Sequence, residues 1–389
     1  MLARVAEDLF WMSRYVERAV AVARLIDVTL HLELDDGDPD DAMTLWTPLL
    51  RPALGEKFSR LSGPGGQSAA GGHPSTGANG ADSDGGDEGD EGDEGDDIGN
   101  VLTLLTAPVA RDVRYDLAFN EDNPGSMAAL VRRARAAARG VRECISSEMW
   151  EQLNTLYLSL VKPQVAAEAE EDPHSFHKHV REGAQFFHGL ADATLAHDEA
   201  WHFITLGKYL ERAGSVARVL NLETHLLMPG ATSRGGDEIV RWLAVLRSCG
   251  SAEAYARYYS LRVEPARVVE FLLLNPVFPQ SVRFSLNAAW DALAGIAERG
   301  TIFRDGARGA DPAVRALGLL RARLEHAAVD EVLDEGLDSY LSDVQERIEV
   351  VAQRITHSYL RREPQTGRVV GIARAAMMMA GQQQQQQQQ

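Results

Sequence analysis

The sequence predicts an all-α protein, and three observations support this prediction. Apolar residues recur at intervals close to 3.6 over most of the chain, as in helices that bury one face. Ala, Leu, Arg and Glu, which favour helix, dominate these stretches. No run of alternating β-branched residues, the usual mark of a half-buried strand, stands out. We therefore expect helices throughout, packed into bundles.

The expected helices follow one another from the first residues to about residue 362. They are residues 3–33, 125–160, 173–196, 197–226, 236–249, 265–274, 279–299, 312–328 and 335–362. Proline is well tolerated in a first helical turn, so Asn123-Pro124, Glu264-Pro265 and Asp311-Pro312 mark starts. Gly250 and Met228-Pro229-Gly230 mark ends.

A motif near the N-terminus returns in the middle of the chain. Tyr15-Val16-Glu17-Arg18-Ala19 is matched by Tyr209-Leu210-Glu211-Arg212-Ala213, and an Ala-Arg pair follows each at the same distance. Other residues match in spacing: Asn120, Pro124 and Ser126 with Asn275, Pro279 and Ser281, and Ser175 and Val180 with Ser339 and Val344. Such repetition predicts an internal duplication. The expected fold is a duplicated helical bundle with two pseudo-equivalent halves, residues 1–56 plus 99–196 and residues 197–362.

The two halves differ in length at one place. Trp46 and Asn120 are 74 residues apart, whereas Trp242 and Asn275 are 33 apart. The excess coincides with residues 57–98, most of which form a Gly-, Asp- and Glu-rich run that cannot bury enough apolar surface to offset its ordering entropy. We expect a disordered acidic insertion there, and a disordered tail at 363–389 that ends in poly-Gln.

Charge and cysteine content narrow the function classes. The acidic run supplies ten carboxylates, more than half of the formal net charge of −18. A solvated insertion explains it most simply, with a weak Ca²⁺ site or a tail for a basic partner as alternatives. Overall acidity argues against binding to nucleic acid. The sequence has no uninterrupted 18-residue apolar run, so no membrane-spanning helix is expected. The two cysteines, Cys144 and Cys249, exclude a disulfide framework and fit a reducing cytoplasm, which is the expected location.

Each copy of the motif places charged side chains on one stripe of its helix. The stripes consist of Arg14, Glu17, Arg18 and Arg24 in the first copy and of Lys208, Glu211, Arg212 and Arg218 in the second. One interpretation is an exposed ladder of ion pairs, each worth about 0.3 kcal/mol. The alternative is a shared cleft in which arginines hold carboxylates or phosphates. We expect Glu17 and Glu211 in a charged cleft between the bundles, each paired with arginine from its own stripe.

Weaker signals lie outside these stripes. Asp198, Glu199 and His202 could share a metal at a helix start, but the first half lacks the motif, so a packed histidine beside a capping acid is the simpler interpretation and no metal is expected. Glu148 and Glu151 lie one turn apart and could serve acid–base chemistry only with a partner across the bundle. The run from residue 275 to 281 reads as a helix break and an N-cap, with anion binding as the alternative.

Five segments, taken together, resemble the bacterial alpha-E domain family. They are LFWMSRYVERAVAVARLIDV, LAFNEDNPGS, ARGVRECISSEMWEQLN, HDEAWHFITLGKYLERAGSVAR and FLLLNPVFPQSVRF, in that order. The resemblance covers about residues 1–362 apart from the insertion and implies an all-helical fold. Similar proteins are typically encoded beside a circularly permuted ATP-grasp protein and a transglutaminase-like cysteine peptidase, which the resemblance implies as partners. Val20, Gly214 and Ala136 stand where the family usually carries acidic residues.

Two functions from different classes follow. The first is a helical partner or scaffold protein of an ATP-grasp-linked peptide synthesis or modification system, in keeping with the lack of a nucleophile elbow, a P-loop or a Cys/His pair. The second is an enzyme that acts on a peptide or an activated acyl intermediate with the duplicated Glu and Arg residues. No cofactor is expected in either case. Convergence of Glu17 and Glu211 in one pocket would favour the enzyme, and exposed, distant positions would disfavour it.

Overall fold

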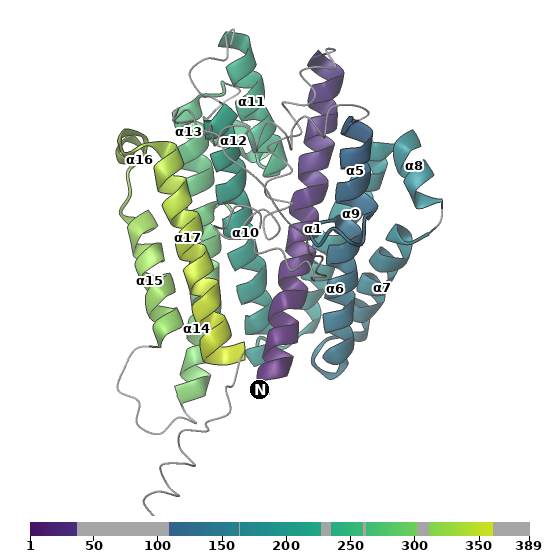
Figure 1. Ribbon diagram of the computed structural model, residues 1–389. Helices are drawn as coiled ribbons and strands as arrows, with labels where there is room; N and C mark the ends of the chain where they lie inside the picture. The colour runs from purple at the N-terminus through teal and green to yellow at the C-terminus, as the bar shows by residue number, and fades with distance from the viewer. Residues whose placement is uncertain (37–108, 163, 227–234, 260–261, 302–310, 361–389) are drawn as a thin grey trace, which may run out of the picture.

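The structure is a computed structural model that describes residues 1–36, 109–162, 164–226, 235–259, 262–301 and 311–360. All regular structure within these ranges is helical, which confirms the predicted all-α class (Figure 1). The predicted insertion at 57–98, the tail at 363–389 and Trp46 lie outside the described residues, so the expectations for them stay predictions.

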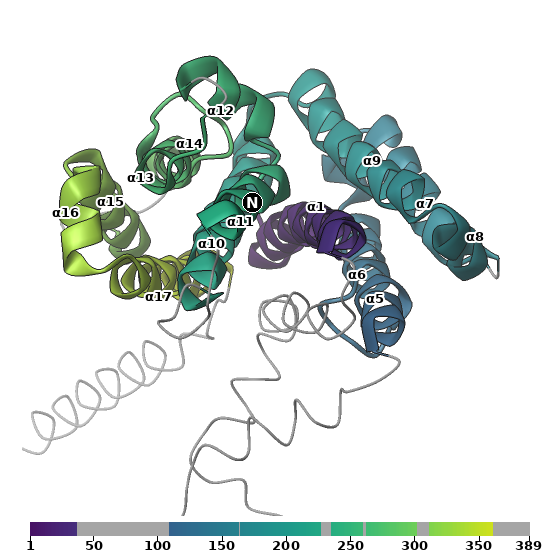
Figure 2. The ribbon, with the colours of Figure 1, turned by 90° about the horizontal axis from the view of Figure 1, so that it is seen from above.

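Two long helices form the centre of the molecule. α1 (Ala3–Asp36) and α10 (Glu199–Leu226) pack along each other (Figures 1 and 2). The middle of α1 is enclosed, because residues 12–24 are all buried except four that are half-buried. Ala19 and Ala23 are fully buried, and their small side chains let a neighbouring helix approach closely. A helix enclosed in this way can place charged side chains in the interior only where they find partners.

The first group of helices packs around α1. α6 (Met127–Gly140) and α9 (Pro173–Thr194) contact α1, and α7 (Ser147–Leu160) packs against both of them. Two shorter helices flank this group: α5 (Val109–Phe119) lies on α6, and α8 (Val165–Glu171) lies on α9.

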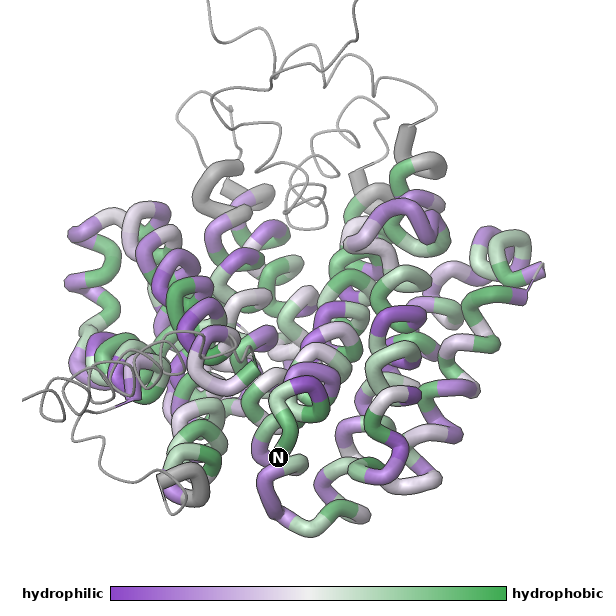
Figure 3. Tube along the Cα trace, turned by 60° about the horizontal axis from the view of Figure 1, so that its bottom comes forward, coloured by the Kyte–Doolittle hydropathy of each residue, from purple (hydrophilic) through white to green (hydrophobic). Residues whose placement is uncertain are grey.

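The second group packs around α10 in the same order of contacts. α14 (Val282–Thr301) and α17 (Leu337–Ile355) contact α10, and α15 (Pro312–Glu325) packs against both of them. α16 (Val329–Glu335) lies on α17. The remaining helices are α11 (Gly235–Ser248), which contacts both α1 and α10, α12 (Ala252–Tyr259) and α13 (Pro265–Val269). Apolar and polar residues interleave along the helices, as expected when each helix buries part of its surface (Figure 3).

The turns that precede α6 and α14 are built alike. The Ser126 hydroxyl accepts a hydrogen bond from Ala129 N (3.1 Å) and donates one to the Asn120 carbonyl (2.7 Å). The Ser281 hydroxyl accepts from Phe284 N (3.0 Å) and donates to the Asn275 carbonyl (2.5 Å). Each serine therefore satisfies an otherwise unpaired N–H of the first helical turn. The predicted helix break and N-cap at 275–281 are confirmed.

Several predicted boundaries need correction. The predicted helix over 125–160 is two helices, because Ser146 caps α7 by accepting from Met149 N at 3.2 Å and the chain turns between them. The predicted helix over 312–328 ends at Glu325. The helices over 265–274 and 335–362 finish in π-helical turns, Glu270–Leu274 and Thr356–Leu360. The short helices α5, α8, α12 and α16 were not predicted, since each is too brief to show a clear period.

Among the helices that the structure describes, none combines the length and the apolar character needed to cross a bilayer.

Candidate functional site

The two copies of the repeated motif meet where α1 packs against α10. Glu17 on α1 and Glu211 on α10 are 5% and 1% exposed, so the interpretation as an exposed ladder is wrong. Each carboxylate is held chiefly by arginine from the opposite helix. The predicted pairing within one stripe is therefore also wrong for the main contacts.

Glu17 makes a two-pronged contact with Arg212 of α10. Arg212 Nε donates to Oε1 at 2.6 Å, and Nη2 donates to Oε2 at 3.1 Å. Arg212 Nη1 also donates to the Pro279 carbonyl at 3.3 Å, which ties the pair to the turn before α14. The planar fork of guanidinium matches a carboxylate in this geometry, so the contact fixes both position and orientation.

Glu211 accepts from three arginines. Arg18 of α1 donates from Nε to Oε1 at 2.7 Å and from Nη2 to Oε2 at 3.0 Å. Arg14 of α1 donates from Nε to Oε2 at 2.8 Å. Arg218, from the same helix as Glu211, donates from Nη2 to Oε1 at 3.1 Å. Of the predicted contacts within one stripe, the Glu211–Arg218 contact is therefore present.

Side-chain geometry explains the crosswise pattern. Residues three, four or seven apart on one helix point in similar directions, so their heads lie beside one another rather than opposite. A guanidinium that comes from the facing helix can approach a carboxylate head-on with both prongs. The charged stripes thus point at the neighbouring long helix, and their pairing fastens α1 to α10.

Both glutamates are ionised at neutral pH. Burial raises the pKa of Glu17, but Arg212 and the contact with His188 outweigh burial and hold the pKa well below its usual range. Burial likewise raises the pKa of Glu211, and Arg18, Arg14 and Arg218 together lower it well below the ordinary value. Carboxylates held in this way are poor proton acceptors, which weighs against a role as general base.

His188 of α9 completes the surroundings of Glu17. Its Nε2 lies 3.2 Å from Glu17 Oε2, and the side chain is 5% exposed. Burial lowers the pKa of His188, so the ring is neutral at pH 7. Sequence reasoning missed this residue, because a histidine directly after Phe187 on an apolar helix face is indistinguishable from an ordinary core histidine.

Lys208 and Arg24, the other members of the two stripes, do not reach the glutamates. Lys208 Nζ lies 3.5 Å from Asp192 Oδ2, and burial lowers the pKa of its ammonium group. Arg24 is half-buried and has no hydrogen bond or ion pair with any residue that the structure describes. Burial lowers the pKa of Arg24, and the nearby Glu17 opposes this effect.

Arg24 borders a hollow between α1, α10, α11 and the turn before α14. The hollow is shallow, opens to solvent, and is lined by Glu17, Arg212 and Cys249 among others. Burial raises the pKa of the Cys249 thiol to about 12, so this cysteine is not a nucleophile at neutral pH. Gly250 (φ +62°) gives Arg24 its space, because a Cβ there would lie 2.8 Å from Arg24 Cζ.

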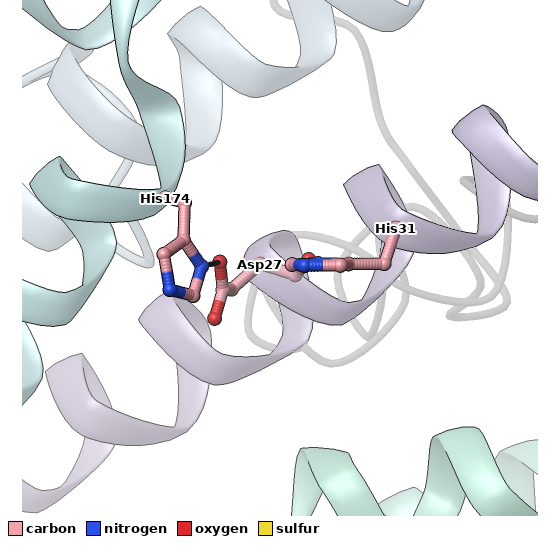
Figure 4. Close-up of side chains that lie close together, drawn as sticks. All are labelled: Asp27, His31 and His174. Carbon is pink, nitrogen blue, oxygen red and sulfur yellow. Dashed lines mark hydrogen bonds and ion pairs between the residues drawn. The ribbon is translucent and has the colours of Figure 1, made fainter.

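Asp27, His31 and His174 form the one group of three potential metal ligands found within the described ranges, with ligand atoms within 4.8 Å of one another. His174 Nδ1 lies 2.8 Å from Asp27 Oδ1, and His31 Nδ1 lies 2.7 Å from the Asp27 carbonyl oxygen (Figure 4). Arg181 Nη1 donates to the other carboxylate oxygen at 3.2 Å. This guanidinium opposes a cation at the carboxylate, so the group acts as a tie between α1 and α9. No sequence spacing brings residues 27 and 174 together, and the group was not predicted.

The lower-ranked candidates do not converge. Asp198 caps α10 by accepting from Ala200 N at 2.9 Å, and Glu199 pairs with the N-terminal ammonium group of Met1 at 2.9 Å. The His202 ring lies against Gly295 of α14. Glu148 is exposed in the first turn of α7. In each case the simpler structural interpretation describes what the residue does.

A family model described as a predicted alpha-helical domain with a conserved ER motif, Alpha-E, matches residues 1–360. The chain belongs to the alpha-E family. Glu17-Arg18 and Glu211-Arg212, the Glu-Arg dipeptides at the contact of α1 with α10, fit that description. The alpha-E chain is 26% identical to uncharacterized proteins of Mycobacterium bovis and Mycobacterium tuberculosis over 88% of its own length and 34% of theirs. It thus spans about a third of the length of these curated relatives. No solved structure matches significantly.

Proposed function

We propose that this alpha-E chain is a helical partner or scaffold protein of an ATP-grasp-linked peptide synthesis or modification system. The observation that carries the proposal is the use of both motif glutamates in buried contacts between α1 and α10. Glu17 is occupied by Arg212, and Glu211 by Arg14, Arg18 and Arg218. A motif in this state fastens two helices and offers no reactive group.

The proposal includes an origin by duplication, with halves at residues 1–56 plus 99–196 and 197–362. Three observations support it. Residues 12–24 of α1 and residues 206–218 of α10 were aligned by the motif, and each aligned pair is either buried in both helices or half-buried in both. The capping turns at Ser126 and Ser281 make the same hydrogen bonds. The helices around α1 and those around α10 contact one another in the same order.

The ion pairs between α1 and α10, which join Glu17 to Arg212 and Glu211 to Arg14 and Arg18, suit a scaffold. We call these pairs the crosswise lock. Buried ion pairs of strict geometry add less to stability than their number suggests, but they specify which surfaces meet and in which orientation. The lock thereby holds the two groups of helices as one unit and leaves their outer faces for partners. The resemblance supplies the partners, a circularly permuted ATP-grasp protein and a transglutaminase-like peptidase, and the two free cysteines suit the cytoplasm as their meeting place.

One observation favours the enzyme as a second candidate. Glu17 and Arg212 line a hollow that opens to solvent, so a substrate could reach them. Catalysis by Glu17 would require Arg212 to leave the carboxylate, since a paired carboxylate of low pKa accepts protons poorly. Glu211 is not among the residues that line that hollow, so the two glutamates do not meet in it.

Co-purification with the ATP-grasp protein that the resemblance implies as a partner tests the proposal. We expect a complex of defined stoichiometry by size-exclusion chromatography with light scattering, and ligase activity that depends on the alpha-E chain. The alpha-E chain alone should not turn over a peptide or an acyl phosphate. Absence of a complex at micromolar concentrations, together with turnover by the chain alone that Glu17→Gln abolishes, would replace the scaffold with the enzyme.

A further inference from the structure

The hollow beside Glu17 carries one unbalanced positive charge. Its charged lining residues are Glu17, Arg24 and Arg212. Arg212 and Glu17 neutralise each other, whereas Arg24 has no partner among the described residues. We propose that this hollow is a binding site for the carboxylate group of a small molecule or a peptide end, held by Arg24.

The surroundings of Arg24 explain why it has no partner among the described residues. In the second copy of the motif, the equivalent Arg218 donates to Glu211. In the first copy, both oxygens of Glu17 accept from Arg212, and His188 lies against the same carboxylate. Arg24 thus remains as a half-buried guanidinium with no anionic partner in the part of the chain that the structure describes. A partly desolvated charge without a partner is costly, and a bound carboxylate would lower that cost.

The polar lining suits the oxygens of a carboxylate. Ser215, Ser248 and Gln280 line the hollow beside Arg24, and each carries a hydrogen that can be donated to an anion. Arg24 supplies the planar fork that binds a carboxylate with two parallel hydrogen bonds. These groups come from α10, α11 and the turn before α14, so they converge on the hollow from three sides.

The apolar lining indicates what the carboxylate is attached to. Val20 of α1 and Val216 and Val219 of α10 also line the hollow. Apolar walls exclude water, which strengthens the ion pair with Arg24, and they favour an aliphatic group next to the carboxylate. An amino acid residue at the end of a peptide has this arrangement.

The charge balance favours a carboxylate over a phosphate. A single surplus positive charge matches one negative charge, whereas the second charge of a phosphate dianion would face Glu17. The inference does not rest on the proposed partner, since carboxylate binding is measured on the purified chain without it.

Calorimetric titration of the full chain with N-acetyl-L-alanine tests the site. We expect binding of this carboxylate, no binding of its neutral amide, and binding of inorganic phosphate that is weaker by about tenfold or more. Equal binding of carboxylate and phosphate, binding of the amide, or no binding of the carboxylate up to roughly 10 mM would overturn the proposal.

Three variants locate the site. Arg24→Gln removes the charge and should weaken binding at least about tenfold, because hydrogen bonds to charged groups are the stronger class. Ala21→Leu, also on the lining, fills the hollow, keeps Arg24, and should weaken binding similarly. Arg347→Gln removes an exposed arginine paired with Asp343 on α17 and should leave binding unchanged. Unchanged binding in Arg24→Gln, or in Ala21→Leu, with a melting temperature close to that of the parent, would contradict the assignment.

Discussion

The two motif glutamates sit in surroundings that differ although their sequences match. Glu211 is enclosed by Arg14, Arg18 and Arg218, and its side chain is fully shielded from solvent. Glu17 is held by one arginine and a neutral histidine, and it borders a hollow that opens to solvent. The motif around Glu211 is closed to solvent, and the motif around Glu17 borders a hollow that solvent can enter.

The two glutamates differ in solvent access because two basic residues at equivalent motif positions make different contacts. The position of Arg14 in the first copy is taken in the second by Lys208, which turns to Asp192 instead of Glu17. The position of Arg218 is taken in the first copy by Arg24, which stays in the hollow. Similar residue types at the same spacing can therefore be fully enclosed in one motif and border a solvent-accessible hollow in the other, because the facing helices supply different neighbours.

The largest expected effect comes from Glu211→Gln. The substitution leaves three buried or half-buried guanidinium groups around a neutral amide, and breaking a buried pair in this way costs about 3–5 kcal/mol. Glu17→Gln leaves one arginine and a neutral ring and should cost less, about 2 kcal/mol. Chemical denaturation of both variants measures the difference. A greater loss for Glu17→Gln would break the distinction between the two clusters.

Acid should weaken the two clusters in different pH windows. The pKa of Glu211 is lowered in the folded state, so its contribution is present above about pH 4.5 and is lost as pH falls further. The pKa of His188 is also lowered, so protonation of the unfolded chain begins to reduce stability as pH falls below about 6.5.

His188→Gln should therefore flatten the fall in stability between pH 7 and pH 5 and leave the steeper fall below pH 4.5 in place. His177 titrates in the same upper window, because burial lowers its pKa to about 4, and it contributes about 2 kcal/mol between pH 7 and pH 5. Melts across pH 3–8 in a His177→Gln background isolate the contribution of His188. An unchanged slope between pH 7 and pH 5 would contradict the assignment.

Gly250→Ala probes the space in which Arg24 lies. The backbone of Gly250 is left-handed, which strains an alanine, and the new methyl group would also contact the Arg24 guanidinium. We therefore expect the free energy of unfolding to fall by about 1–2 kcal/mol. Gly336→Ala is the control, since its φ of +95° imposes strain but no atom lies within 4 Å of the new Cβ.

Added to Gly250→Ala, the change Arg24→Ala should restore part of the lost free energy of unfolding. Added to Gly336→Ala, it should restore none. Urea denaturation of the four combinations measures this recovery. Equal recovery at both glycines would show that the contact with Arg24 is not the cause.

The smallest effect should come from Arg347→Gln. This arginine pairs with Asp343 four residues earlier on the same helix, and both side chains are accessible to solvent. Pairs of this type contribute below about 0.5 kcal/mol. If Arg347→Gln lowered the free energy of unfolding as much as Glu17→Gln in the same assay, the exposed pair would be as important as the buried pairs. The contrast between them would then be wrong.

The sequence was sufficient for the class of fold and for the importance of the repeated motif. Periodicity located the long helices α1, α9, α10 and α17 to within a few residues at most ends, because each buries a continuous face. The duplicated spacing singled out Glu17 and Glu211. Helix breaks such as the one before Ser146 were missed, since a single capping serine within a periodic stretch interrupts the helix without interrupting the period.

The partners of those glutamates could not be predicted. Glu17 and Arg212 are 195 positions apart, and which arginine faces which carboxylate depends on how α1 and α10 are turned against each other. The same holds for His188 beside Glu17 and for His174 beside Asp27. A helical wheel shows which residues of one helix share a stripe. Which residues of another helix face that stripe depends on how the helices pack in the bundle.

A double-mutant cycle tests the crosswise lock most directly. The coupling free energy between Glu17 and Arg212, measured by denaturation of Glu17→Gln, Arg212→Gln and the double variant, should be about 2 kcal/mol. The same cycle for Glu17 and Arg24, which share a helix, should give a clearly smaller value, because no hydrogen bond joins them among the described contacts. Coupling to Arg24 as strong as coupling to Arg212 would show that the motif is paired within its own helix, and the account of α1 locked to α10 would not stand.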